Sequence, residues 1–185
     1  MSYDYSENEL VQKSAAHLLH DELGWDVVYA YHTEQLGTDG TLGRESYQEI
    51  LLRRDLVDAL HRLNPWMDDA QVEAALDALE RRLSSASLLQ VNEEKYFLIR
   101  DGVPVTVKQP DGREEQRRAM VIDFADPAQN RFLAVQEMKI HGDIYHRRTD
   151  IVGFVNGIPL LFIELKKNTV DVRAAYDDNY TDYLD

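Results

Sequence analysis

The spacing of hydrophobic residues changes about halfway along the chain. In the first part apolar side chains recur every three or four positions, which is typical of amphipathic helices. Further on they form short runs separated by turns, which is typical of strands. The helical spacing covers residues 6–23, 46–63 and 68–83, with one strand-like run at 25–31. The later strand-like runs are residues 103–108, 119–124, 132–140, 151–155 and 158–166, and a closing helical pattern covers residues 171–184.

Helices followed by a mixed sheet and a closing helix predict an α+β fold, or in the wider sense an α/β sandwich. The chain has 185 residues, of which 44% are hydrophobic. That length is enough to bury one sizeable core without splitting. We therefore expect a single domain over residues 1–185.

Composition excludes several classes of protein. There are no cysteines, so the sequence encodes neither a disulfide framework nor a cysteine-ligated zinc site. No apolar run approaches the roughly 20 residues that span a bilayer. The first residues lack the basic and apolar regions of a signal peptide. We expect a cytoplasmic protein with no membrane partner.

The two strand-like runs 151–155 and 158–163 are separated only by Asn156-Gly157. Asn-Gly between apolar runs is a strong signal for a tight β-hairpin. Because both runs are almost entirely apolar, we expect the hairpin in a buried central sheet.

Charged residues gather at one end of this hairpin. Asp150 opens the first strand, and Glu164 and Lys166 close the second. Such charges beside a core strand pair are costly unless they pair with one another or hold a metal. A spacing of two places Glu164 and Lys166 on one face of the strand. This arrangement favours a magnesium-dependent phosphodiesterase.

Asp150 followed by Glu164-x-Lys166 resembles the PD-(D/E)xK nuclease signature, with Thr149 where the signature usually has proline. The surrounding sequence resembles the N-terminal nuclease domain of the restriction (R) subunit of type I restriction enzymes over most of residues 6–183. The segments that carry this resemblance, in order, are 23–25, 43–47, 63–65, 121–124, 130–132 and 148–166.

The resemblance implies a restriction-endonuclease-like fold, a mixed central sheet flanked by helices. It also implies Mg²⁺ bound by Asp150, Glu164 and the backbone carbonyl of Leu165, with Lys166 acting on the attacking water. Glu9 is a further candidate ligand, and its alternative role is a capping box with Ser6.

Several other residues are candidates for contact with DNA. They are Arg148, Lys167, His146, Asn179 and Tyr183. Asn179-x-x-x-Tyr183 resembles the Gln-x-x-x-Tyr motif that follows the catalytic lysine in this family, but asparagine is one methylene shorter, and an amphipathic helix with exposed tyrosines is the alternative. His146, with His141, flanks a turn where exposed histidines are common. Glu137, at the end of a neighbouring strand, is another candidate for the metal site, but the favoured interpretation is a solvated charge.

The net charge of −14 is unusual for a protein that binds DNA unaided. Residues 137–168 contain five basic and four acidic side chains, so the acidic excess lies elsewhere. We expect this chain alone to hold DNA poorly.

By resemblance, duplex DNA is cut after translocation by an ATP-driven helicase motor, in a complex with methyltransferase (M) and specificity (S) subunits. The sequence has no Gly-x-x-x-x-Gly-Lys-Ser/Thr phosphate loop, so we expect ATP to bind in motor domains outside this chain. The chain is then expected to be a fragment of a larger subunit. Two alternatives stay open: an inactive docking or gating module of the same subunit, and a stand-alone PD-(D/E)xK repair nuclease.

The hairpin also carries a geometric expectation. A regular two-residue loop would place Asp150 and Glu164 on opposite faces. Convergence on one metal needs a one-residue shift. We expect a three-residue loop, Val155-Asn156-Gly157, with Gly157 left-handed, or a bulge farther along either strand.

Overall fold

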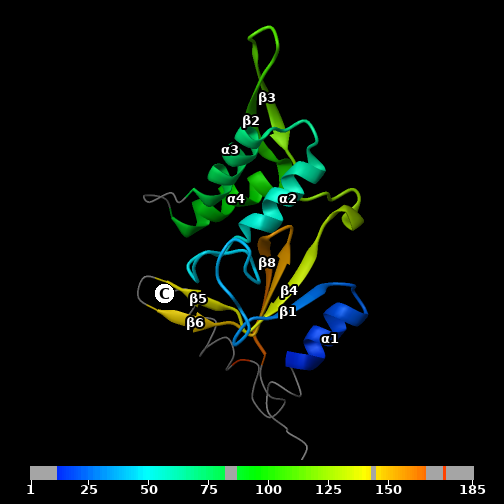
Figure 1. Ribbon diagram of the computed structural model, residues 1–185, viewed down its shortest axis with the longest axis vertical. Helices are drawn as coiled ribbons and strands as arrows, with labels where there is room; N and C mark the ends of the chain where they lie inside the picture. The colour runs from blue at the N-terminus through cyan, green and yellow to red at the C-terminus, as the bar shows by residue number, and fades with distance from the viewer. Residues whose placement is uncertain (1–11, 82–86, 143–144, 166–172, 174–185) are drawn as a thin grey trace, which may run out of the picture. The chain divides into compact units, whose positions relative to one another are not determined.

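The computed structural model describes residues 12–81, 87–142 and 145–165, together with Arg173 (Figure 1). These residues form two compact units. Described residues up to Ile50, Phe132–Val155 and those from Pro159 onward make the first unit. Leu51–Arg131 and Asn156–Ile158 make the second.

The first unit is built on a four-stranded mixed sheet. Its strands are β1 (Asp26–Tyr29), β4 (Phe132–Gln136), β7 (Ile151–Val155) and β8 (Ile158–Ile163), in that spatial order. β1 pairs with β4 in parallel, whereas β4 and β7 are antiparallel. Every residue of β7 is buried, as the apolar run predicts for a central strand. The expected α+β fold is confirmed.

Helix α1 (Lys13–Asp21) packs against this sheet through its apolar face. Its Leu19 joins Ala134 of β4 and Ile151 of β7 in one buried cluster, against which Trp25 packs. The first half of the predicted helix 6–23 and most of the closing helix 171–184 lie outside the described residues.

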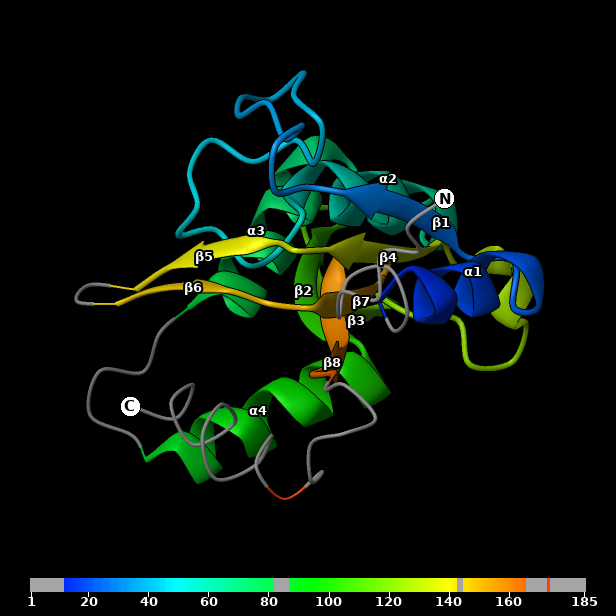
Figure 2. The same cartoon turned by 90° about the horizontal axis from the view of Figure 1, so that it is seen from below.

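The β4–β7 pair continues into a second pair of strands without a change of register. Gln136 faces Ile151 in the first pair, and Lys139 faces Arg148 in the second, formed by β5 (Lys139–His141) and β6 (His146–Arg148). Between them the Glu137 amide donates to the Asp150 carbonyl at 2.9 Å. Figure 2 shows β5 and β6 running on from β4 and β7 as a narrow two-stranded ribbon.

The predicted strand 132–140 is therefore interrupted at Glu137 and Met138, between β4 and β5. Glu137 has φ 51°, a left-handed conformation that glutamate seldom adopts. The two parts of the hairpin meet at this kink, and Asp150 is the residue directly opposite Glu137.

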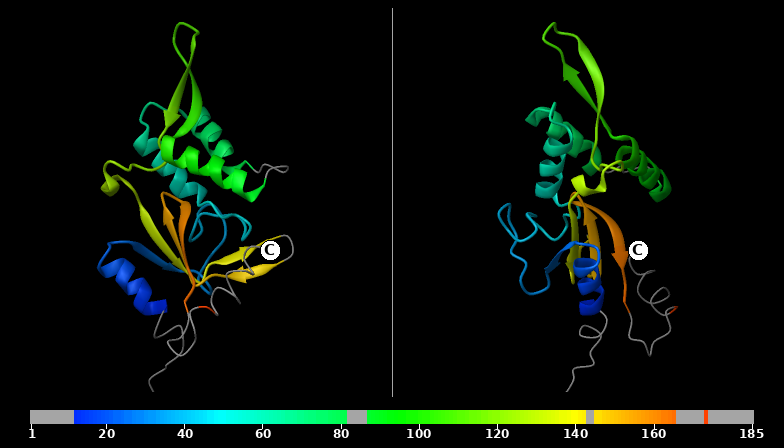
Figure 3. Two further views of the ribbon diagram at one scale, coloured as in Figure 1. Left: turned by 180° about the vertical axis from the view of Figure 1, so that it is seen from behind. Right: turned by 90° about the vertical axis from the view of Figure 1, so that its right-hand side faces the viewer.

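The second unit combines helices with a long hairpin. Figure 3 shows strands β2 and β3 as an elongated hairpin whose turn lies beyond the ends of α3 and α4. The elements are α2 (Arg53–Leu63), α3 (Asp69–Glu80), α4 (Leu88–Asp101), β2 (Val103–Lys108), β3 (Glu114–Ala119) and the short 3₁₀ helix η2 (Pro127–Gln129).

The predicted helix 46–63 was wrong in its first turns, because α2 begins only at Arg53. The Glu49 carboxylate accepts hydrogen bonds from the Glu45 and Ser46 amides, both at 3.1 Å. The Glu49 carbonyl accepts from the Arg44 guanidinium. These side-chain partners hold the segment as a turn.

The predicted strand 119–124 was also wrong beyond Ala119, where β3 ends. Asparagine side chains take the place of a partner strand. The Met120 amide donates to Asn64 Oδ1 at 2.7 Å, and the Asp123 amide donates to Asn130 Oδ1 at 2.8 Å.

Helix α4 and most of strand β3 were missed by the sequence analysis. α4 has no buried residue, so its apolar spacing is weak, although Ser87 and Gln90 form a capping box at its start. β3 is almost entirely polar and is defined by its pairing with β2.

Candidate active site at the end of the β7–β8 hairpin

Asp150 lies directly before β7 and is held on both carboxylate oxygens. Oδ1 accepts a hydrogen bond from Gln12 Nε2 at 2.6 Å, and Oδ2 accepts one from the Leu165 backbone amide at 2.7 Å. The carboxylate is thus fixed between the start of α1 and the end of β8.

The contact with Leu165 brings the two ends of the hairpin together, as the sequence predicted. Asp150 therefore lies beside the backbone that carries Glu164, and both acidic residues are partly buried. This places two carboxylates in one small region of the first unit.

The turn of the hairpin differs from the three-residue loop that we expected. Asn156 and Gly157 both have positive φ, 51° and 81°, which is the signature of a two-residue type I′ turn. The three-residue loop with only Gly157 left-handed is wrong.

We infer that the one-residue shift lies farther along the hairpin. A methyl group added to Gly153 would lie 2.9 Å from Leu161 Cβ, so these two residues point to the same face. Regular pairing from a two-residue turn would instead set Gly153 against Leu160. We infer an extra residue in β8 near Pro159, which has no N–H to donate to the ladder.

The shift has a direct consequence for the acidic residues. Side chains alternate between faces along a strand, and Asp150 and Glu164 are each three positions from the Gly153–Leu161 pair. Both residues lie one position beyond the ends of their strands, so a shared face for the two carboxylates stays a prediction.

Glu137 is a third carboxylate at this point, and its interpretation as a solvated charge was wrong. It is only 4% exposed. Oε1 lies 3.6 Å from Arg148 Nη1, and Oε2 has no hydrogen-bond partner in the described part of the chain. The sequence feature that could have indicated the burial of Glu137 is its position immediately after an apolar strand. The pairing of Glu137 with Asp150 across the two strands was not visible in the sequence.

Thr149 is fully buried where the nuclease signature usually has proline. Its backbone amide and its hydroxyl both donate to the Met138 carbonyl, at 3.1 and 3.4 Å. The substitution thus adds cross-strand hydrogen bonds and leaves Asp150 in place.

The donor chemistry fits a hard cation, because carboxylate and carbonyl oxygens are the ligands that Mg²⁺ prefers. The buried Glu137 Oε2, which has no hydrogen-bond partner among the described residues, agrees with this. Among residues 12–81, 87–142 and 145–165, however, no three acidic or histidine side chains converge as a ready-made metal cluster.

Arg148 and His146 lie on β6, and both are exposed. The Arg148 guanidinium lies 4.6 Å from the centre of the Tyr31 ring. The His146 ring stacks edge-on with His141 at 4.0 Å. Desolvation lowers the pKa of His141, and the nearby His146, Lys139 and Arg44 lower it further.

Five predicted site residues lie outside the described residues, and their places in the site stay predictions. They are Glu9, Lys166, Lys167, Asn179 and Tyr183.

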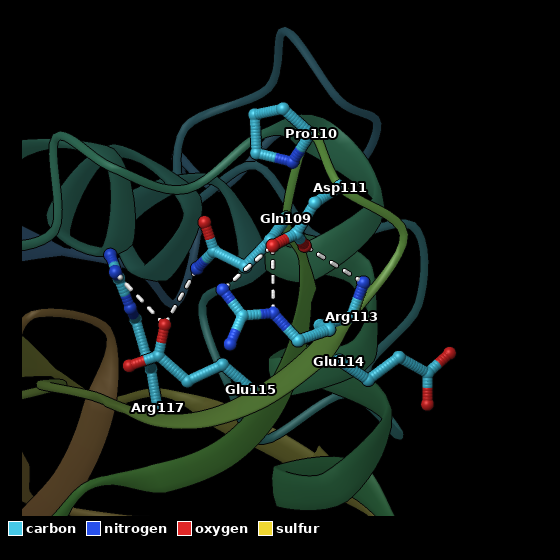
Figure 4. A pocket seen from close by; sticks show the side chains of 7 residues that line it. All are labelled: Gln109, Pro110, Asp111, Arg113, Glu114, Glu115 and Arg117. Carbon is cyan, nitrogen blue, oxygen red and sulfur yellow. Dashed lines mark hydrogen bonds and ion pairs between the residues drawn. The ribbon is translucent and has the colours of Figure 1, made fainter.

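A hollow at the tip of the β2–β3 hairpin is a poor alternative site (Figure 4). Its charged groups already bind one another. Arg113 pairs with Asp111, and Glu115 pairs with both Arg117 and Gln109. Across the described helices, none is both long and apolar enough to cross a membrane.

Comparison with known proteins supports a single family. A family model described as "Type I restriction enzyme R protein N terminus" matches residues 4–185. The chain is 29% identical to the type I restriction enzyme HindI endonuclease subunit of Haemophilus influenzae, over 97% of this chain and 17% of that subunit. It is 27% identical to the putative type I restriction enzyme MjaIXP endonuclease subunit of Methanocaldococcus jannaschii, over 77% of this chain and 14% of that one. The chain thus spans less than a fifth of either relative.

Proposed function

This chain belongs to the family of type I restriction enzyme R protein N-terminal domains, and we propose on that basis that it is a magnesium-dependent DNA endonuclease domain. The observation that carries the proposal is the hydrogen bond from the Leu165 amide to the Asp150 carboxylate, which supports a site shared by Asp150 and Glu164 at the end of the β7–β8 hairpin. The proposed reaction is hydrolysis of phosphodiester bonds in duplex DNA.

Phosphodiester hydrolysis needs an in-line water, stabilisation of the negative charge that develops on the phosphoryl group, and help for the leaving oxygen. Mg²⁺ held by Asp150, Glu164 and the Leu165 carbonyl would supply charge neutralisation and activation of water. Glu9 is proposed as a further ligand.

The chain's own residues prepare this site. Gln12 and the Leu165 amide hold the Asp150 carboxylate in one orientation, so little reorganisation is needed when substrate binds. Lys166 is proposed to orient the attacking water and to accept its proton. Its ammonium form would then stabilise the phosphoryl oxygens.

The wider setting is also proposed from the family. The relatives are much longer than this chain, so ATP-driven translocation is assigned to the remaining, helicase part of the same subunit. Sequence recognition and methylation are assigned to the S and M subunits. Arg148, His146, Lys167, Asn179 and Tyr183 are proposed to support DNA binding next to the site.

The first prediction tests the catalytic residues in the complete enzyme. Asp150→Ala, Glu164→Ala and Lys166→Ala should each lower the rate of DNA cleavage by at least about 100-fold, because each removes a group that acts on the reacting phosphate or water. ATP hydrolysis by the same complex should be unchanged, since the motor lies elsewhere. Asp111→Ala, at the tip of the β2–β3 hairpin, is the matched control and should cut normally.

Near wild-type cleavage by any of the three variants in the presence of magnesium would contradict this assignment. In that case the second candidate, a catalytically silent docking module of the same subunit, would be favoured. The net charge of −14 is the observation that supports that candidate. The family match speaks against a stand-alone repair nuclease.

A further inference from the structure

The β5–β6 ribbon, residues 139–141 and 146–148, carries cationic or titratable side chains at nearly every paired position. Lys139 faces Arg148, His141 faces His146, and Arg147 faces Ile140. Arg148 and His146 are exposed, and the other cations are partly exposed. Three of the 20 basic residues thus lie on one short ribbon, although the chain as a whole has 34 acidic residues.

Aromatic rings lie against these cations. The Tyr31 ring contacts two of them, with Lys139 Nζ at 5.0 Å and Arg148 Cζ at 4.6 Å from its centre. Tyr145 lies 4.9 Å from the Arg147 guanidinium. Stacking on a ring restricts a long side chain without neutralising its charge, so the cations are oriented before a ligand arrives.

Of the nearby acidic groups, Glu137 lies 3.6 Å from Arg148, and Glu34 is bound by Arg44. Both oxygens of Glu34 accept hydrogen bonds from Arg44, at 2.6 and 2.8 Å. Arg44 also donates to the Lys139 carbonyl at 2.8 Å, and the His141 amide donates to the Tyr47 carbonyl at 2.9 Å. Arg44 and Tyr47 therefore fix β5, and Arg44 binds the Glu34 carboxylate at the same time.

We propose that the β5–β6 ribbon is a surface that binds the phosphate backbone of duplex DNA and leads it to Asp150. This inference rests on the proposed nuclease function. Lysine and arginine are the usual phosphate contacts, and a two-stranded ribbon is narrow enough for the DNA major groove. Arg148 is two residues from Asp150 on a hairpin of unbroken register, so phosphates bound by the ribbon lie next to the candidate site.

The β2–β3 hairpin provides the contrast. It is also a two-stranded ribbon with exposed arginines, but Arg113 is paired with Asp111 and Arg117 with Glu115 (Figure 4). These two arginines are neutralised within the hairpin, whereas Lys139 lies against the uncharged rings of Tyr31 and Tyr47. Arg148 lies against Tyr31 and 3.6 Å from the buried Glu137 carboxylate.

The test measures duplex DNA binding by the 185-residue chain, by fluorescence anisotropy over a series of salt concentrations, with EDTA present to prevent cleavage. The double variant Lys139→Gln, Arg148→Gln should weaken binding. It should also reduce the slope of log affinity against log salt by about 2, one for each lost phosphate contact. The control Arg113→Gln, Arg117→Gln removes the same charge and should leave the slope unchanged.

A second pair of variants separates ring stacking from net charge. Tyr31→Phe should bind like the wild type, whereas Tyr31→Ala should bind more weakly although no charge is lost. Circular dichroism of each variant establishes that the fold is kept.

The inference is overturned if the ribbon and control variants change the salt slope equally, or if the wild-type chain shows no binding at low salt. Either result leaves the nuclease proposal to be judged by cleavage in the complete enzyme. Conversely, cleavage by an Asp150→Ala complex would refute the nuclease proposal, while the binding data would still report on the ribbon.

Discussion

Glu137 has a left-handed backbone conformation and a buried side chain. A substitution there changes the free energy of unfolding in two ways, through the backbone strain and through the loss of the buried carboxylate. A non-glycine residue in this conformation costs about 1 kcal/mol or more. Such strain persists only where the surrounding structure fixes it, and here the ladder on both sides of the kink does so.

The second prediction follows from this conformation. Glu137→Gly and Glu137→Ala both remove the carboxylate, but only glycine relieves the backbone. Glu137→Gly should therefore be more stable than Glu137→Ala by about 1 kcal/mol in urea denaturation. Equal stabilities, or alanine the more stable, would show that the left-handed conformation carries no strain.

The third prediction concerns pH and His141. Its pKa is lowered by desolvation and by the surrounding His146, Lys139 and Arg44, with the ring of Tyr47 also packed against it. Below about pH 6.5 the unfolded chain thus binds more protons at this residue, so its contribution to folding stability decreases as pH falls. DNA has the opposite effect, because phosphates favour the protonated imidazole.

Binding of duplex DNA should consequently tighten as pH is lowered from about 7.5 to about 5.5, although the protein itself becomes less stable. Anisotropy titrations at constant ionic strength measure this. In His141→Asn the pH dependence should be smaller than in the wild type. An unchanged dependence would place the titrating group elsewhere.

At the level of elements, the turn of the β7–β8 hairpin depends on close approach to its neighbours. A methyl group on Gly157 would lie 2.4 Å from the Leu52 carbonyl oxygen and 3.0 Å from the Leu56 nitrogen. Both contacts are to backbone, which cannot rotate away. The Leu52 amide also donates to the Gly157 carbonyl at 2.9 Å, so the turn and the start of α2 hold each other.

The fourth prediction compares two glycines of similar backbone conformation. Gly157 has φ 81° and Gly112 has φ 84°, but nothing lies within 4 Å of a methyl group added at Gly112. Gly112→Ala should cost about 1 to 2 kcal/mol from backbone strain alone. Gly157→Ala should cost clearly more, because the clash adds to the strain. Chemical denaturation of the two variants measures the difference, and equal costs would contradict the packing described here.

The hairpin also shows what could be predicted from sequence. Asn156-Gly157 between apolar runs was sufficient to predict the position of the turn and the burial of β7. The expected burial of the second strand was wrong, because Leu160, Leu161 and Phe162 of β8 are exposed. The register was not predictable, because the extra residue that we infer in β8 rests on the close approach of Gly153 to Leu161. Likewise α4 lacked a buried face, and the segment after Ala119 is held by asparagine side chains distant in sequence.

The same distinction applies to the candidate site. The residue types and spacing of Asp150 and Glu164 were sufficient to nominate them. The burial of Glu137 and the hydrogen bond from Gln12 to Asp150 were not foreseeable, since each depends on residues brought together by strand pairing or by packing of α1.

At the scale of the whole molecule, net charge is the dominant property. A total of −14 repels DNA at long range, and salt screens the few cations that attract it. The β5–β6 ribbon can bind DNA only where it is held near the duplex. We propose that the remaining subunits hold it there.

The fifth prediction is that this chain alone binds duplex DNA only at low salt and cleaves it weakly or not at all. Mobility-shift and cleavage assays of the 185-residue chain test this. Tight binding at physiological salt would refute the prediction, because it would require an attraction that the charge distribution does not supply.

The register is unbroken between the two parts of the long hairpin, so the distance along the chain from the β5–β6 ribbon to Asp150 is fixed. Four residues separate His146 from Asp150, and at about 3.3 Å per residue they span about 13 Å. Successive phosphates of one DNA strand are about 3.4 Å apart along the helix axis, so this length corresponds to about four nucleotides. A DNA backbone bound along the ribbon would be cut at a fixed distance from the bound phosphates, whatever its base sequence. The position of the cut would then be set by strand length, measured from wherever the DNA comes to rest.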